Sequence, residues 1–224
     1  MPTRLRRPAA VFVLLSAVLW LSLAGAAPAQ AEKGYRRDVY FAAGYEHQVN
    51  SVTCTAASTA MMVNFIARRD LNLNQSTILS WEKPRDALRD SIQRGSDPLG
   101  WSRAATYYAS KIGHPTTYTW EAYGSARSAL RRAAIQIART GKPVGLLVSH
   151  GTHAMVMTGV QASIDPTRSS TFTLFSIMVS DPNGLPHQAY PATASPLNSY
   201  LQTDATPSYD AAWYGRYIVI VPEN

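Results

Sequence analysis

A run of small and apolar residues without glycine or proline begins at Cys54 and continues to Ile66. Its positions at helical spacing are Ala57, Ala60, Met61, Asn64 and Phe65. The pattern predicts a buried helix whose first residue is the cysteine. Thr53 is expected as its N-cap, with Arg68 and Arg69 in the last turn, where the helix dipole favours positive charge.

Further helices are predicted downstream of this one. Helix openings are indicated at three places, namely Asn74, Pro84 and Pro98. A longer helix is predicted over residues 125–140, and Gly141 is typical of a helix stop. The aromatic residues of the middle region are expected in the core: Trp101, Tyr107 and Tyr108.

After Gly141 the pattern changes to short β-branched segments separated by turn residues. Strands are predicted over residues 143–148, 153–160, 172–180 and 216–221, with an earlier one over 39–41. The turn at residues 149–152 is short, so an antiparallel sheet is expected. Helices followed by strands indicate the α+β class. Residues 185–208 are expected to form a long surface excursion that borders a cleft.

The first 31 residues have the features of an export signal. Arg4, Arg6 and Arg7 precede an apolar run over residues 11–23, and the small residues up to Ala31 are typical of a cleavage site. The alternative is an uncleaved anchor, because the apolar stretch can be extended to nearly the length of a membrane span. We expect cleavage after Ala31, a secreted protein, and no stable membrane association afterwards.

The remaining residues, 32–224, suit one compact domain, which we expect to be a monomer. The composition, 46% apolar and 16% charged, is that of a globular chain. The net charge of +7 falls to +4 once the three signal arginines are removed, and the remaining basic residues are spread along the chain. This distribution argues against a nucleic-acid partner.

Cys54 is the single cysteine, so it cannot form an internal disulfide. In an exported chain an odd cysteine is a buried bystander, an intermolecular link or a reactive thiol. A helix N-terminus stabilises the thiolate, which is the nucleophilic form. The position of Cys54 therefore makes it a candidate nucleophile, although a small buried residue is the commonest fate of a free cysteine.

Gln48 precedes the cysteine by six positions, across a loop that can fold back beside the thiol. Acyl transfer from a peptide or amide develops negative charge on the carbonyl oxygen. A side-chain amide together with the backbone N–H of Cys54 could stabilise that charge. An ordinary polar loop residue is the alternative interpretation of Gln48.

His153 stands at the start of an otherwise apolar predicted strand. Catalysis by a cysteine and a histidine needs an imidazole on a rigid element that faces the thiol, which makes His153 the candidate base. The competing candidate is His150, which lies in the turn. A structural histidine at a strand end is the alternative.

Asp181 ends the next predicted strand and is followed by Pro182, Asn183 and Gly184. Adjacent strands would bring Asp181 beside His153, where it would orient the imidazole and stabilise its charged form. Asn183 is the second candidate for this role. Capping of the turn by the carboxylate is the alternative.

These motifs, together with the Gly-Lys-Pro-Val strand entry and the Gly-x-His pattern, resemble the bacteriocin-processing-peptidase-like, or C-thirty-nine-like, branch of the papain-like cysteine peptidases. The resemblance implies a helical half with Cys54 on its long helix, a sheet half with His153 and Asp181, and a cleft between them. It gives Gln48 the oxyanion role and implies a peptide or protein substrate.

The chain also departs from that family. Members often carry Gly-Pro after the cysteine, whereas Thr55 and Ala56 follow it here. This weakens a link to the transporter-linked enzymes that cleave leader peptides, so a free-standing exported relative is the better description. Two alternatives remain open: an inactive relative that binds without turnover, and a cysteine acyltransferase or cell-wall amidase.

No cofactor is needed for the predicted chemistry, and no metal site is expected. His150 and His153 lack a matching pair of ligands at a spacing typical of zinc sites. The other histidines are expected in loops: His47, His114 and His187.

Overall fold

A computed structural model describes residues 34–87, 95–193 and 213–224 of the chain. The predicted signal over residues 1–31 and its cleavage site lie outside the described residues. Residues 33–224 form one compact unit, and its described part combines helices with an antiparallel sheet. The α+β class is therefore confirmed.

The four α-helices of the described residues begin and end close to the signals in the sequence. Asn74 caps one of them by accepting a bond from Thr77 N–H, and Ser125 caps another in the same way from Ser128 N–H. Gly141 ends the last helix with a left-handed backbone, φ 68°. The helices are α1 (Cys54–Ala67), α2 (Gln75–Glu82), α3 (Pro98–Lys111) and α4 (Ala126–Thr140). Single 3₁₀ turns lie at Ala42–Gly44, Lys83–Arg85 and Ser149–Gly151.

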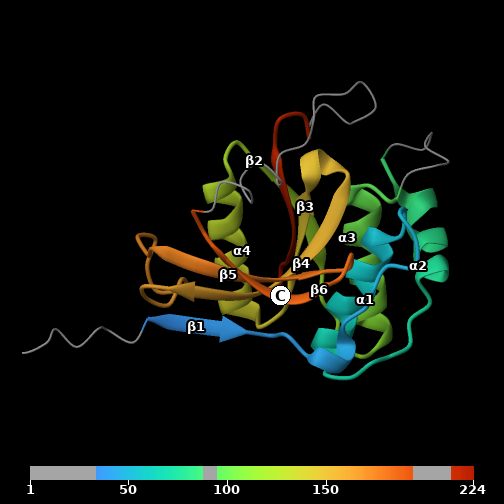
Figure 1. The fold of residues 1–224 in the computed structure, drawn as a ribbon, viewed down its shortest axis with the longest axis horizontal. Coiled ribbons are helices and arrows are strands. Elements are labelled where there is room, and N and C mark those ends of the chain that lie inside the picture. Colours follow the sequence, from blue (N-terminus) through green and yellow to red (C-terminus); the bar gives the residue numbers. More distant parts are fainter. Residues whose placement is uncertain (1–33, 88–94, 194–212) are drawn as a thin grey trace, which may run out of the picture. The chain divides into compact units, whose positions relative to one another are not determined.

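Seven strands in the described part of the chain form one antiparallel sheet, in the order β2-β7-β3-β4-β5-β6, with β1 paired to β4 (Figure 1). Short hairpins join β3 to β4 and β5 to β6, which sets these strands side by side. The strands are β1 (Tyr35–Asp38), β2 (Tyr118–Tyr123), β3 (Val144–Val148), β4 (His153–Ala162), β5 (Leu174–Asp181), β6 (Leu185–Pro191) and β7 (Tyr217–Pro222).

Helices cover both faces of the sheet. Alternate residues of β7 face opposite layers: Val219 and Val221 pack in the cluster of α4, while Ile218 and Ile220 pack in the cluster of α1 and α3. Figure 1 shows α4 on one side of the central strands and α1, α2 and α3 on the other. The helix that begins at Cys54 is thus packed directly on the sheet, as the family resemblance implies.

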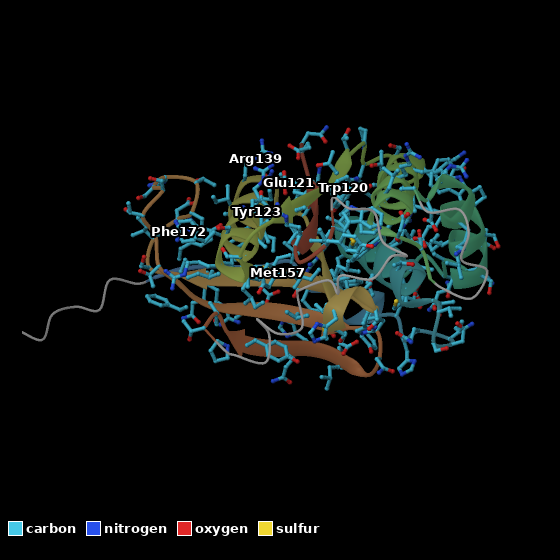
Figure 2. The ribbon with its side chains drawn as sticks, turned by 90° about the horizontal axis from the view of Figure 1, so that it is seen from above. Trp120, Glu121, Tyr123, Arg139, Met157 and Phe172 are labelled. Carbon is cyan, nitrogen blue, oxygen red and sulfur yellow. The ribbon has the colours of Figure 1, made fainter. Side chains whose placement is uncertain are left out.

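The edge strand β2 is tied to α4 by charged side chains. Arg132 donates to Glu121 through two nitrogens, the shorter contact being 2.7 Å, and Tyr123 donates its hydroxyl to the same carboxylate. Glu121 and Tyr123 lie close together on β2 (Figure 2), while Trp120 packs in the cluster of α1 and α3. This strand was not among the elements predicted from the sequence.

Several sequence predictions are wrong in detail. The early strand is Tyr35–Asp38 rather than 39–41, because its pairing partner is the end of β4. Residues 185–191 are not part of a surface excursion but form strand β6, hydrogen-bonded to β5. The rest of that segment, from residue 194 to 208, lies outside the described residues.

The ends of α1 also differ from the prediction. Thr53 occupies the N-cap position, but its hydroxyl donates to Asn50 O at 3.1 Å and caps no helix amide. Arg68 is the C-cap residue rather than part of the last turn, with φ 54°. It donates to the backbone oxygens of Val39 and Tyr40, each at 3.1 Å.

Within the described ranges, none of the helices has the length and apolar character that a membrane crossing requires.

Candidate active site

Cys54 is the first residue of α1 and is 6% exposed. It packs in the cluster that joins α1 and α3 to the sheet, so its backbone is held by the core. The amides of a helix's first turn have no partner within the helix and carry its positive dipole end. Cys54 thus stands at the start of a helix, where the sequence placed it.

His153 is placed by the tight hairpin between β3 and β4. Ser149 and His150 both have left-handed backbones, with φ 52° and 55°, so the chain reverses within a single 3₁₀ turn. His153 then starts β4 opposite Val148. An imidazole on the first residue of a paired strand is held on a rigid element, which a proton-transferring group needs.

Asp181 and His153 meet as the sequence predicted. The Oδ1 atom of Asp181 lies 2.7 Å from Nε2 of His153. The same oxygen accepts the backbone N–H of Asn183 at 2.8 Å. Asn183, the second candidate for orienting the ring, therefore contributes its backbone to holding the carboxylate.

The thiol of Cys54 approaches the same imidazole. Burial of the ring disfavours its charge, but the hydrogen bonds that the ring makes to Asp181 and to Cys54 outweigh burial and raise the pKa of His153 to about 9. Because Asp181 holds Nε2, Nδ1 is the ring nitrogen left for the sulfur. One imidazole thus bridges a thiol and a carboxylate.

The carboxylate of Asp181 is also held in place by its neighbours. Burial opposes ionisation of Asp181, yet its bonds from His153 and Asn183 lower its pKa below the ordinary value. Tyr45 donates its hydroxyl to the backbone oxygen of Asp181 at 2.8 Å. Tyr45 is a supporting residue that the sequence analysis missed, since its contact joins positions 136 residues apart.

Gln48 lies next to the strand that carries Asp181. Its backbone N–H donates to Pro182 O at 2.8 Å, and its side-chain Nε2 donates to Asn50 O at 3.0 Å. Its Oε1 is buried and has no hydrogen-bond partner among the described residues. A half-turn of the amide exchanges its two ends, so the buried position can hold a donor instead.

The other histidines have different surroundings. His150, the competing base, is exposed in the turn, and His47 is exposed with Nδ1 2.8 Å from Gln48 O. His187 is not in a loop, as predicted, but on β6, where it pairs with Asp38 at 3.0 Å and stacks on Tyr40. In the parts of the chain that the structure describes, no three histidine, cysteine or acidic side chains gather as metal ligands would.

The free energy of unfolding is expected to depend on pH through His153. Its folded pKa of about 9 lies above the ordinary 6.5, so the folded chain binds more protons between these values and stability falls as pH rises. The stabilisation is complete below about pH 6.5 and lost above about 9. Asp181, whose pKa is lowered, contributes above its ordinary value of 3.8 and loses this contribution as pH falls.

Replacing His153 with glutamine should therefore destabilise the protein most near pH 6 and least above pH 9. Urea unfolding of the wild type and the variant at about pH 6 and about pH 9.5 measures the difference. Equal destabilisation at both values would contradict a proton held between Asp181 and Cys54.

Comparison with known proteins reveals similarity in structure only. No family model matches the chain, and no curated protein matches it. Among solved structures it is similar to a crystal structure of UfSP from C. elegans, with a TM-score of 0.49 and 13% sequence identity. The match covers 85% of this chain and 34% of that one, so the chain spans about a third of the length of UfSP. A likeness at this level carries no argument about activity.

Proposed function

We propose that the protein is a papain-like thiol hydrolase that cleaves peptide or amide bonds. The observation that carries the proposal is the position of His153, whose ring contacts Asp181 through Nε2 and interacts with the thiol of Cys54. A nucleophile, a base and an orienting carboxylate in this order are the requirements of cysteine-dependent acyl transfer.

In this mechanism the Cys54 thiolate attacks the substrate carbonyl carbon and forms a tetrahedral intermediate. The imidazolium of His153 gives its proton to the leaving amine as the carbon–nitrogen bond breaks, which leaves a thioester on Cys54. Neutral His153 then takes a proton from water, whose oxygen attacks the thioester and releases the acid. Asp181 keeps the ring oriented and stabilises its charged form through both steps.

The finer assignment rests on the sequence. The Gly-x-His pattern at His153 and the Asp-Pro that follows β5 support a free-standing relative of the bacteriocin-processing-peptidase-like branch. The basic and apolar N-terminal segment supports export and a secreted product, which we propose to be a monomer. A peptide or protein is the proposed substrate. Turnover of a peptide or amide substrate would distinguish this protein from an inactive relative that only binds. Transfer of the acyl group to water, rather than to an amine, would distinguish it from an acyltransferase.

Alkylation of Cys54 by iodoacetamide tests the proposal without a known substrate. An unperturbed thiol has a pKa of about 8.5 and reacts slowly near pH 6, whereas a thiolate paired with an imidazolium stays reactive there. We expect the wild type to react at about pH 6 and His153→Ala to react at least about tenfold more slowly. The labelling rate across pH 4–9 is the measurement.

His187→Ala is the matched control, because His187 also pairs with an aspartate but does not contact the thiol. Its labelling profile should follow that of the wild type. A wild-type thiol that reacts only near pH 8.5, or a profile unchanged in His153→Ala, would mark Cys54 as a bystander and end the hydrolase assignment.

A further inference from the structure

A buried carboxyl group lies against the helix that carries the candidate nucleophile. Glu82, the last residue of α2, is 0% exposed. Its Oε2 accepts the hydroxyl of Thr55 at 2.8 Å, and its Oε1 accepts the hydroxyl of Thr59 at 3.0 Å. Among the described residues, no lysine or arginine forms an ion pair with it. Both oxygens are thus used to hold α1.

The two threonines lie where movement would matter most. Thr55 directly follows Cys54, and Thr59 lies one turn further along α1. Both are buried, at 2% and 0% exposure, so water does not compete for their hydroxyls. The two contacts fix how the start of α1 is rotated about the helix axis, and how far along that axis it lies, relative to α2. Cys54 projects from that turn.

The surroundings of Glu82 disfavour its negative charge. Burial raises its pKa to about 8, with smaller increases from Asp86 and Asp97 and opposing effects from the two threonines. Burial also raises the pKa of Asp86 to about 7. Burial therefore favours the protonated form of the Glu82 carboxyl.

Acidic and aromatic groups of the neighbouring elements lie near this cluster. Asp86 follows the 3₁₀ turn after α2 and accepts bonds from Ser96 and from the backbone of Asp97, the N-cap of α3. Burial raises the pKa of Tyr108 on α3, and the negative charge of Glu82 adds a smaller increase. Lys83 adds a positive charge, with its Nζ 3.9 Å from Asp86.

We propose that Glu82 is a positioning residue for Cys54, and that it holds the first turn of α1 as a neutral carboxylic acid. The inference rests on the proposed function, because it concerns the reactivity of the thiol. A protonated carboxyl can hold both threonines, because its carbonyl oxygen accepts one hydroxyl and its O–H donates to the other, and it adds no charge that opposes the thiolate. An ionised carboxylate in a buried site would repel the thiolate and counteract the helix dipole.

Two substitutions of Glu82 separate this role from simple structural support. Glu82→Leu keeps the volume roughly and removes both acceptors, so the first turn loses its anchor. The labelling rate of Cys54 rises with pH as the thiolate forms, and we call this rise the acid limb. In Glu82→Leu the acid limb should move to higher pH by about half to one unit. Glu82→Gln is neutral and has nearly the same shape, and it should restore the wild-type limb.

Further variants keep the test valid if Glu82→Leu does not fold. Thr55→Val with Thr59→Val removes the same two bonds from the α1 side and should shift the limb in the same direction. Thr116→Val is the matched control. Thr116 is equally buried and donates to His114 O at 3.1 Å, far along the chain from α1, so it should lower the melting temperature without moving the limb.

The outcomes are distinct. A limb unmoved in Glu82→Leu and in the double threonine variant overturns the inference, since Glu82 then supports only stability. A shift of the same size in Glu82→Gln overturns it too, because the native group would have to be charged. Failure of the wild type to show a His153-dependent acid limb would instead reject the proposed function.

Discussion

Replacing Gln48 with alanine is expected to lower kcat for peptide or amide hydrolysis by about 10²- to 10³-fold, and to leave the alkylation rate of Cys54 nearly unchanged. Hydrolysis passes through a tetrahedral oxyanion that a side-chain donor stabilises, whereas alkylation by iodoacetamide has no such oxyanion. The two rates therefore separate stabilisation of the transition state from activation of the thiol.

The surroundings of the Gln48 amide are the physical basis of this prediction. Gln48 is anchored through its backbone to Pro182, beside Asp181, and the Oε1 end of its amide is buried without a partner. An unpaired buried oxygen is unfavourable, and the bond from Nε2 to Asn50 O is the side-chain contact that holds the amide in its present orientation. Its Nε2, now bonded to Asn50, can turn toward a substrate oxyanion.

Kinetics on a mixed peptide substrate, with labelling by iodoacetamide in parallel, would measure both rates. Gln188→Ala is the matched control, since Gln188 is an exposed glutamine on β6 outside the candidate site. An equal loss of hydrolysis and of labelling in Gln48→Ala would show that Gln48 acts on the thiol or on the loop, and would remove it from the oxyanion role.

Trp101→Ala is expected to cost about 3–5 kcal/mol of unfolding free energy and to lower the melting temperature by about 10 °C. Trp101 is 0% exposed and packs in the same cluster as Cys54. A side-chain carbon added at Gly145 of β3 would lie 2.6 Å from its ring, so the indole rests directly on the sheet backbone. Its loss leaves a cavity between α3 and the strands.

Trp81→Ala is the matched comparison for this prediction. Trp81 is only half-buried and stacks on Tyr107, with ring centroids 4.6 Å apart. It lacks the sheet contact, so its truncation should cost clearly less than that of Trp101. Denaturant unfolding of both variants measures the difference. A loss of unfolding free energy below about 1 kcal/mol for Trp101→Ala would contradict the packing of its indole on the sheet.

The sequence predicted the elements whose pattern is local. The α1 helix, the start of α3 and the end of α4 at Gly141 follow from helical spacing and from capping residues. The strands β3, β4, β5 and β7 follow from short β-branched runs between turns. In each case the residues that decide the structure lie within one element or its flanks.

The missed strands depend on distant partners. Residues 118–123 alternate and are rich in aromatic residues, a signal that could have identified β2, but the strand's pairing is with β7 near the other end of the chain. The segment 185–191 contains two prolines and polar residues, which argue against a strand. It forms β6 because it is the edge strand and needs to pair only with β5.

The candidate site divides in the same way. The sequence by itself singled out Cys54, His153 and Asp181, because a thiol at a helix start and polar residues at strand ends are local features. Only the tertiary structure brought His153 and Asp181 to 2.7 Å, turned Asn183 into a backbone donor, and set Tyr45 behind the carboxylate. Contacts between distant segments depend on register, which composition does not encode.

Glu82 is the clearest case of this limit. In the sequence it is one acidic residue near the end of a short helix, a place where a carboxylate is usually solvated. The packing of α2 on α1 buries it completely and gives both its oxygens to threonines beside the thiol. The sequence determined which chemical groups the protein has and on which elements they lie, while the tertiary packing decided which of them lose water and meet, and hence their protonation.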